Sequence, residues 1–381
     1  MSPSIIEAAW RAHENTSSHP GGALSTAQFT PGSHMKDFQA VQLGRIHQVL
    51  RWSTIPDFIG GRDEEGEKVI SLSLWVQHTL MESTTRALFG ETLQKVEPNV
   101  VQALARYDED SWKFTYQIPA AFSRSMLSAK AVVQDAIFQY FELPLSERAD
   151  ACWMVTSMEA EMRALGATSK DVSASMMLLY WVANTNAWKA AFWMLARILH
   201  DLKLKQQVER EIDLEAIATL SPADLQLRLD SLPLLNAVYY EVLRTTASSI
   251  SVRDVLSDCV IGSFKLQKGS RLIVPFRQML LDSAVFPSPD IFSPERFLHN
   301  PSLAKDPSFR PFGGGTTFCP GRFVAQQMAT TMVALVLSRF RIEPKEPEIL
   351  IPECDEKKPC LGVMGMKDGE DVTVVVRSRV Q

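Results

Sequence analysis

One of the five cysteines of this 381-residue chain, Cys319, stands in a glycine-rich loop before an apolar run with helical spacing. The loop reads Phe312-Gly-Gly-Gly-Thr-Thr-Phe-Cys319-Pro-Gly321, and the run extends from Val324 to Val336. At the amino end of a helix, free backbone N–H groups and the helix dipole stabilise a thiolate. Glycines let the backbone approach a large flat group without interference from Cβ atoms, and Phe312 can cover one side of that group. The alternative is a tight turn that buries an inert cysteine.

These residues resemble the haem-ligand signature of the cytochrome P450 family, Phe-x-x-Gly-x-x-x-Cys-x-Gly. Its fixed positions correspond to Phe312, Gly315, Cys319 and Gly321. The resemblance implies that the Cys319 thiolate is the axial ligand of the iron of haem b, where a thiolate favours O–O cleavage. It also implies that the cofactor is bound by Phe312, Gly313, Gly315 and Gly321.

Glu241-Val-Leu-Arg244 forms a second motif, on a predicted helix where its two charges share a face. In the cytochrome P450 family such a Glu-x-x-Arg pair joins an arginine from a proline-rich meander and fixes the region behind the haem. Here that arginine would be Arg296, within Phe292-Ser-Pro-Glu-Arg-Phe297. The resemblance therefore implies a structural network of Glu241, Arg244 and Arg296. Without the neighbouring motifs, Glu-x-x-Arg would indicate a solvated pair on a helix.

Arg253, in Ser251-Val-Arg253, follows this helix after a short loop. A family arginine at this place pairs with a haem propionate. The role suits a planar guanidinium because it can bind a carboxylate through two hydrogen bonds. The alternative is an exposed surface arginine. The family's Trp-x-x-x-Arg motif, which also contacts a propionate, is absent from the helix expected over 35–52, and His34 and Lys36 are weak substitutes.

The run Trp181-Val-Ala-Asn-Thr-Asn186-Ala-Trp-Lys-Ala-Ala-Phe-Trp193 contains no acidic residue. Ordinary family members carry an acid followed by an alcohol here, over the iron, and this pair relays protons to bound dioxygen. The run instead resembles the branch of cholesterol 7α-hydroxylase and prostacyclin synthase, which has an asparagine and a following Phe-Trp. We predict that Asn186 lies over the haem as a catalytic residue with Thr185, and that Asn184 takes this place if the register is shifted. Otherwise Asn186 is a polar group satisfied within the helix bundle.

Apolar periodicity predicts a helical framework around these motifs. Helices are expected over residues 35–52, 70–89, 98–107, 112–122, 126–141, 146–165, 170–204, 222–229 and 234–245. The seventh of these is one long helix that carries Asn186. After residue 251 the pattern indicates a hairpin over 259–275 that turns at Lys268-Gly269, a meander over 287–297 and a final strand over 371–379.

These elements predict a mainly α fold with a small β portion, and the motifs imply the cytochrome P450 fold. We expect one domain over 1–381. It would contain an irregular segment (1–30), a mainly helical part (31–250) and a mixed part (251–381) with the strands, the meander, the haem loop and a helix. The membrane anchor, first helix and large β-sheet with which family members begin are not recognisable before residue 30. We therefore expect an amino-terminally truncated member.

The composition is that of an ordinary globular protein, with 46% apolar and 22% charged residues. The formal net charge of −5 gives no support for nucleic-acid binding. The odd number and scattered spacing of the cysteines argue against a disulfide framework and fit a reducing compartment. Tryptophans are expected mainly in the core, namely Trp75, Trp112, Trp153, Trp188 and Trp193.

The resemblance implies a haem-thiolate monooxygenase that receives electrons from NADPH-cytochrome P450 reductase. It would insert one oxygen atom of O2 into an apolar small molecule, such as a sterol, a terpenoid or another secondary metabolite. We expect a monomer at the cytoplasmic face of the endoplasmic reticulum, although the chain lacks the family's anchor. One alternative is an O2-independent isomerase or dehydratase of the prostacyclin synthase type, which the asparagine favours. Another is an inactive haem-binding remnant.

Overall fold

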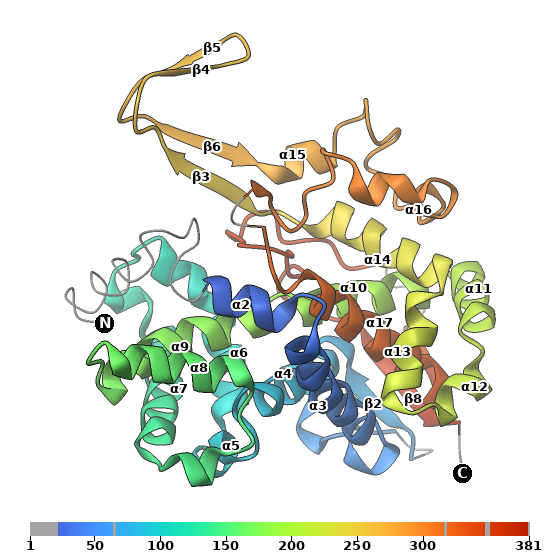
Figure 1. Ribbon diagram of the computed structural model, residues 1–381. Helices are drawn as coiled ribbons and strands as arrows, with labels where there is room; N and C mark the ends of the chain where they lie inside the picture. Colours follow the sequence, from blue (N-terminus) through green and yellow to red (C-terminus); the bar gives the residue numbers. More distant parts are fainter. Residues whose placement is uncertain (1–21, 64–65, 316–317, 347–350, 380–381) are drawn as a thin grey trace.

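The computed structural model describes residues 22–63, 66–315, 318–346 and 351–379, which form a mainly helical body with a projecting β-arm (Figure 1). The α-helices are α2 (Gly22–Phe29), α3 (Ser33–Val49), α4 (Leu72–Phe89), α5 (Thr92–Val96), α6 (Val100–Thr115), α7 (Arg124–Glu142), α8 (Trp153–Ala164), α9 (Ser169–Asn184), α10 (Ala187–His200), α11 (Leu202–Ile212), α12 (Leu214–Thr219), α13 (Pro222–Asp230), α14 (Pro233–Thr246), α15 (Phe276–Leu280), α16 (Glu295–His299) and α17 (Arg322–Arg339). Short 3-10 helices span Trp52–Thr54, Asp57–Ile59, Ala120–Phe122, Leu145–Arg148 and Pro301–Lys305.

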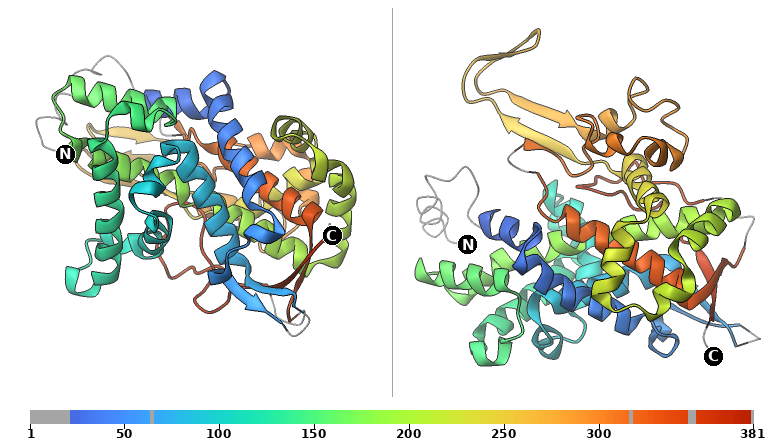
Figure 2. Two further views of the ribbon diagram at one scale, coloured as in Figure 1. Left: turned by 90° about the horizontal axis from the view of Figure 1, so that it is seen from below. Right: turned by 45° about the vertical axis from the view of Figure 1, so that its right-hand side comes forward.

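The strands make up three small antiparallel sheets. They are β1 (Gly60–Arg62), β2 (Lys68–Ser71), β3 (Ile250–Asp254), β4 (Cys259–Ile261), β5 (Phe264–Leu266), β6 (Arg271–Pro275), β7 (Phe340–Pro344) and β8 (Thr373–Ser378). One sheet has the order β1-β2-β8-β7, and the other two are the pairs β3-β6 and β4-β5. In Figure 1 and in the right-hand view of Figure 2, these two pairs extend away from the helical body.

Helix α17 runs through the middle of the body and packs along α10 (Figure 2). Its residues from Ala329 to Leu337 are almost fully buried. The same core cluster reaches from Phe29 near the start of the described chain to Val376 in β8. The helix that follows the cysteine loop is therefore held on all sides, which gives the loop a rigid base.

The predicted long helix over 170–204 is wrong, because the chain forms α9, α10 and α11 in its place. The helix is interrupted at Thr185 and Asn186, whose side chains bond to residues outside it. Such side-chain bonds compete with helical ones, which lowers the helix propensity of both residue types. A second interruption lies at Asp201, whose carboxylate caps α11 by accepting a hydrogen bond from the Leu204 N–H at 2.9 Å.

Other predicted segments also differ from the structure. Helix α6 replaces the helices expected over 98–107 and 112–122; it continues through the charged run that includes the buried Asp108 and ends at Thr115, before the 3-10 turn Ala120–Phe122. The helix expected over 146–165 begins only at Trp153, after a 3-10 turn. The segment 1–30 was expected to be irregular, but α2 lies within it, and residues 1–21 lie outside the described part of the chain.

The predicted hairpin over 259–275 is wrong in its turn and in its pairing. Strand β4 turns at Gly262-Ser263 and pairs with β5, while β6 pairs with β3. Gly262 has a φ of 59°, a left-handed conformation that favours glycine in a tight turn. The final strand is confirmed as β8, and its Val374 and Val376 are fully buried.

Candidate functional site

The cysteine loop is shaped by two glycines and one backbone hydrogen bond. Gly313 and Gly315 have φ values of 76° and 67°, which disfavour any residue with a Cβ atom. The Cys319 N–H donates to the Phe312 carbonyl at 3.1 Å, which closes the loop. The loop then enters α17 at Arg322, whose guanidinium donates to the Cys319 carbonyl at 2.9 Å. The structure thus brings together the predicted residues Phe312, Gly313, Gly315, Cys319 and Gly321.

The Cys319 sulfur occupies a site where burial and helix-end electrostatics oppose each other. Burial raises the pKa of the Cys319 thiol, while the N–H groups of Gly321 and Arg322 and the charge of Arg322 act to lower it. Burial has the larger effect, so the pKa of the Cys319 thiol lies above its ordinary value despite the helix end. A cationic metal at the sulfur would supply the missing stabilisation, because a metal ligated by a thiol displaces its proton. The loop residues therefore fit a haem iron as the ligated group.

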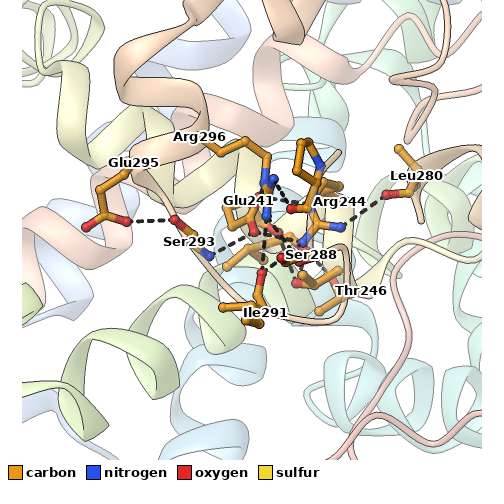
Figure 3. A network of polar contacts seen from close by, with 12 residues as sticks. Glu241, Arg244, Thr246, Leu280, Ser288, Ile291, Ser293, Glu295 and Arg296 are labelled. Atoms are coloured by element: carbon orange, nitrogen blue, oxygen red, sulfur yellow. Dashed lines mark hydrogen bonds and ion pairs between the residues drawn. The ribbon is translucent and has the colours of Figure 1, made fainter. Parts of the chain in front are cut away.

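Glu241, Arg244 and Arg296 meet in one polar network (Figure 3). Arg244 donates to Glu241 Oε2 from Nε at 2.9 Å and to Oε1 from Nη2 at 2.8 Å. Arg296 Nε lies 3.6 Å from Glu241 Oε2, and the Ser293 N–H donates to Oε1 at 2.9 Å. The side chains of Glu241 and Arg244 are 0% exposed. The network ties α14 to the meander that leads to the cysteine loop.

The predicted propionate-binding residues lie apart from this network. Arg253 is an exposed residue of β3, and its Nη1 donates to the Val252 carbonyl at 2.8 Å. The neighbouring strand β6 leads into α15. There, the Phe276 ring lies 3.8 Å from the position that a Cβ atom on residue 313 would take. The β3-β6 ribbon therefore adjoins the cysteine loop. On α3, His34 stacks on Trp153 with ring centroids 3.9 Å apart, and Lys36 is exposed.

The helix interruption borders a cavity of about 680 Å³. Thr185 and Asn186 both line it. The Asn186 Oδ1 accepts a hydrogen bond from the Val363 N–H at 2.9 Å, and Thr185 donates to Asp108. Asn184 is buried instead, and its amide donates to the Tyr180 carbonyl at 2.8 Å. Cys319 is not among the described residues that line this cavity. The structure therefore does not place Asn186 and Cys319 in the same cavity.

Sequence reasoning missed several residues of the cavity wall. Trp112 and Trp188 were expected in the core but line the cavity, as Trp181 does. Asp108 was missed because it stands in the run Asp108-Glu-Asp, which has the pattern of a solvated helix face. A buried tryptophan gives the same sequence signal in a core and in a pocket wall, so only the structure distinguishes them.

The comparison with known proteins decides the family. The sequence model of the family described as Cytochrome P450 matches residues 60–364. This chain belongs to the cytochrome P450 family. The predicted family and the mainly α fold with a small β portion are thereby confirmed. The heme domain of cytochrome P450DA, a solved structure, superposes with a TM-score of 0.72 at 15% identity, covering 99% of this chain and 81% of that one.

Curated relatives match at low identity. Prostacyclin synthase of Bos taurus is 27% identical over 62% of this chain and 51% of its own length. Cytochrome P450 7A1 of Sus scrofa is 26% identical over 51% of this chain and 43% of its own length. Cytochrome P450 monooxygenase poxD of Penicillium oxalicum is 25% identical over 68% of this chain and 55% of its own length. The chain thus spans about half the length of these relatives.

Family membership implies a haem that is held through a cysteine thiolate. Within the described residues, no helix combines the length and the apolar character needed to span a bilayer.

Proposed function

We propose that this cytochrome P450 is a haem-thiolate monooxygenase with Cys319 as the axial ligand. The observation that carries the proposal is the half-buried Cys319 at the end of a glycine loop, in a chain of this family. Bound haem supplies the capacity to activate O2. The electron donor is proposed to be NADPH-cytochrome P450 reductase. The substrate is proposed to be an apolar small molecule, such as a sterol, a terpenoid or another secondary metabolite.

The chain's own residues would hold the cofactor and the substrate in place. Phe312 and the loop glycines are proposed to lie against the haem, and Arg253 is proposed to bind a propionate. Glu241 and its partners keep the meander in position behind the loop. The cavity beside Asn186 has a volume in the usual range for small-molecule sites and is lined by several aromatic rings. We propose that it accepts the substrate.

A second candidate function is an O2-independent isomerisation or dehydration. It is favoured by Asn186, which stands in a helix run without an acid, and by the 27% identity to a prostacyclin synthase. An inactive haem-binding remnant is the third candidate. We further propose that the protein is a monomer at the cytoplasmic face of the endoplasmic reticulum, which gel filtration and cell fractionation can test.

The test is a carbon monoxide difference spectrum of the reduced, haem-reconstituted protein, followed by assays with and without reductase. We expect a thiolate-type spectrum that disappears in Cys319→Ala and persists in Cys259→Ala, a control that removes an exposed cysteine. If Cys319→Ala keeps this spectrum, the assignment of the ligand is refuted. Product that depends on NADPH supports the monooxygenase. Conversion of a peroxide substrate itself to a rearranged or dehydrated product, without NADPH and without oxygen transfer to a second molecule, supports the isomerase or dehydratase. Haem binding without any product supports the remnant.

A further inference from the structure

A buried carboxylate on α6 faces the interruption between α9 and α10. The side chain of Asp108 is 3% exposed, and its Oδ2 lies 3.3 Å from Lys189 Nζ on α10. Its Oδ1 accepts a hydrogen bond from Trp181 Nε1 on α9 at 2.9 Å. The same oxygen accepts a hydrogen bond from Thr185 Oγ1, within the interruption. One carboxylate from a separate helix therefore contacts α9, the interruption and α10.

This carboxylate lies at a cavity wall. Asp108, Thr185 and Lys189 all line the cavity that also reaches Asn186. Burying an ionised carboxylate without partners is strongly unfavourable, and here the Lys189 ammonium and two neutral donors compensate its charge. The position at the wall leaves the Thr185 hydroxyl within reach of a molecule in the cavity.

We propose that Asp108 is the acidic partner of the Thr185 hydroxyl and a positioning residue for oxygenation, an inference that rests on the proposed function. The run from Trp181 to Trp193 has no acid of its own, and α6 supplies one across the helix interface. An ionised carboxylate only accepts hydrogen bonds, so Thr185 must donate to it. A protonated carboxyl donates to Thr185 Oγ1 instead, and the hydroxyl proton is then free to point into the cavity.

The two hydrogen-bond directions together define a proton relay in which the number of protons taken up equals the number released. Asp108 takes up one proton from a hydronium ion of the cavity solvent, which is left as water. It transfers that proton to Thr185 Oγ1 while the hydroxyl gives its own proton to an accepting oxygen atom of a molecule in the cavity, and the carboxylate is restored. No electrons move in this step, and one proton enters for each proton that leaves.

The pH dependence of the relay includes other groups at the same cavity. Burial raises the pKa of Cys360, and Asp108 contributes to this shift. Burial also raises the pKa of Tyr107 beside Asp108 and lowers that of His78 on α4. The remaining charged groups of the wall come from α6, α10 and the segment 355–369, and they are Arg106, Glu109, Lys189, Asp355, Lys358, Lys367 and Asp368.

The first test compares Asp108→Asn with Asp110→Asn in the haem-loaded protein with reductase, without added substrate. Asp110 lies on the same helix and pairs with Lys113, so its variant makes the same charge change away from Thr185. Loss of a positioned acid slows a proton-dependent step by about 100-fold or more. We expect NADPH oxidation to fall by this factor in Asp108→Asn and to lose its solvent deuterium isotope effect. The carbon monoxide spectrum should be unchanged, whereas the melting temperature should fall in Asp108→Asn, because Lys189 loses its ion-pair partner. If Asp108→Asn behaves like the control, the proposal is overturned.

A second pair of variants does not disturb the Asp108–Lys189 ion pair. Thr185→Ser keeps the hydroxyl and should retain the rate and the isotope effect, whereas Thr185→Val should lose both. Adding Asp108→Asn to Thr185→Val should cause no further loss, because both changes interrupt one relay. Equal rates in the serine and valine variants would overturn the relay even if Asp108→Asn does not fold.

Infrared spectroscopy separates this proposal from the proposed function. The carboxylate stretching bands of Asp108, identified by their loss in the difference spectrum of Asp108→Asn, should shift in Thr185→Val. A wild type that binds no haem would refute the proposed function, while these infrared bands would still report the Asp108–Thr185 contact. A band that does not respond to Thr185→Val would mean that Asp108 serves only as a counter-ion of Lys189.

Discussion

Removal of the Glu241 carboxylate should cause a large loss of stability. Glu241 accepts hydrogen bonds from Arg244 and Ser293 and pairs with Arg296. In Glu241→Ala the fully buried Arg244 would keep, among the described residues, two carbonyl acceptors, at 3.1 Å on Leu280 and 3.3 Å on Ile291. Breaking a buried ion pair and leaving its partner charged costs about 3–5 kcal/mol. We expect a decrease of that size in the free energy of unfolding, with loss of haem binding.

The assay is urea unfolding followed by circular dichroism, together with the haem content of purified protein. Glu295→Ala is the matched control, because Glu295 is an exposed meander residue whose side chain accepts from Ser293 Oγ at 2.9 Å. Such a surface change should stay within about 0.5 kcal/mol of the wild type. The double variant Glu241→Ala/Arg244→Met should recover part of the loss, because no unpaired charge remains buried. A single Glu241→Ala variant as stable as the control would show that the network is not structural.

Two other perturbations test the cavity and two half-buried thiols. Asn186→Ala removes the acceptor of the Val363 N–H, so the free energy of unfolding should fall by about 1–3 kcal/mol. The variant should also release more hydrogen peroxide per NADPH. Unchanged stability and unchanged coupling of NADPH oxidation to product would contradict a role for Asn186. Burial raises the pKa of Cys152 and of Cys354 to about 11. In the unfolded chain these thiols ionise from about pH 8.5. Below that pH the free energy of unfolding should keep its full value, and above it this free energy should fall by about 1.4 kcal/mol per thiol and pH unit. Urea unfolding at a series of pH values should show that the free energy of unfolding falls less steeply with pH in Cys152→Ala than in the wild type. An equal slope in the two proteins would exclude the Cys152 contribution.

The sequence was sufficient where the structural information is local. The cysteine loop is recognisable because its glycines and its cysteine have a fixed spacing, and the loop in fact uses left-handed glycines at 313 and 315. Helices α3 and α4 were close to their predicted positions because the buried residues of α3 recur at helical spacing and α4 stops at Gly90. These features depend on residues within one or two turns of each other.

Long-range contacts account for what the sequence did not predict. The partner of Thr185 is Asp108, 77 residues earlier in the chain, and the partner of Asn186 is Val363, 177 residues later. The apolar periodicity of residues 170–204 does not depend on either contact. It therefore favoured one uninterrupted helix. The hairpin failed for the same reason, since alternation identifies strands but not the strand with which each one pairs.

The helix interruption also connects the cavity with the network behind the cysteine loop. Asn186 binds the Val363 N–H, and the two residues flanking Val363 bond to the end of α14. The Met364 N–H donates to the Thr246 carbonyl at 2.9 Å, and the Ser248 N–H donates to the Gly362 carbonyl at 2.7 Å. Gly362 leaves no room for a Cβ atom beside Asn186, so the close approach requires glycine. Helix α14 also carries Glu241 and Arg244. These hydrogen bonds and α14 therefore join the cavity wall to the network of Glu241, Arg244 and Arg296. The cavity and the cysteine loop are therefore held relative to each other although Cys319 does not line the cavity.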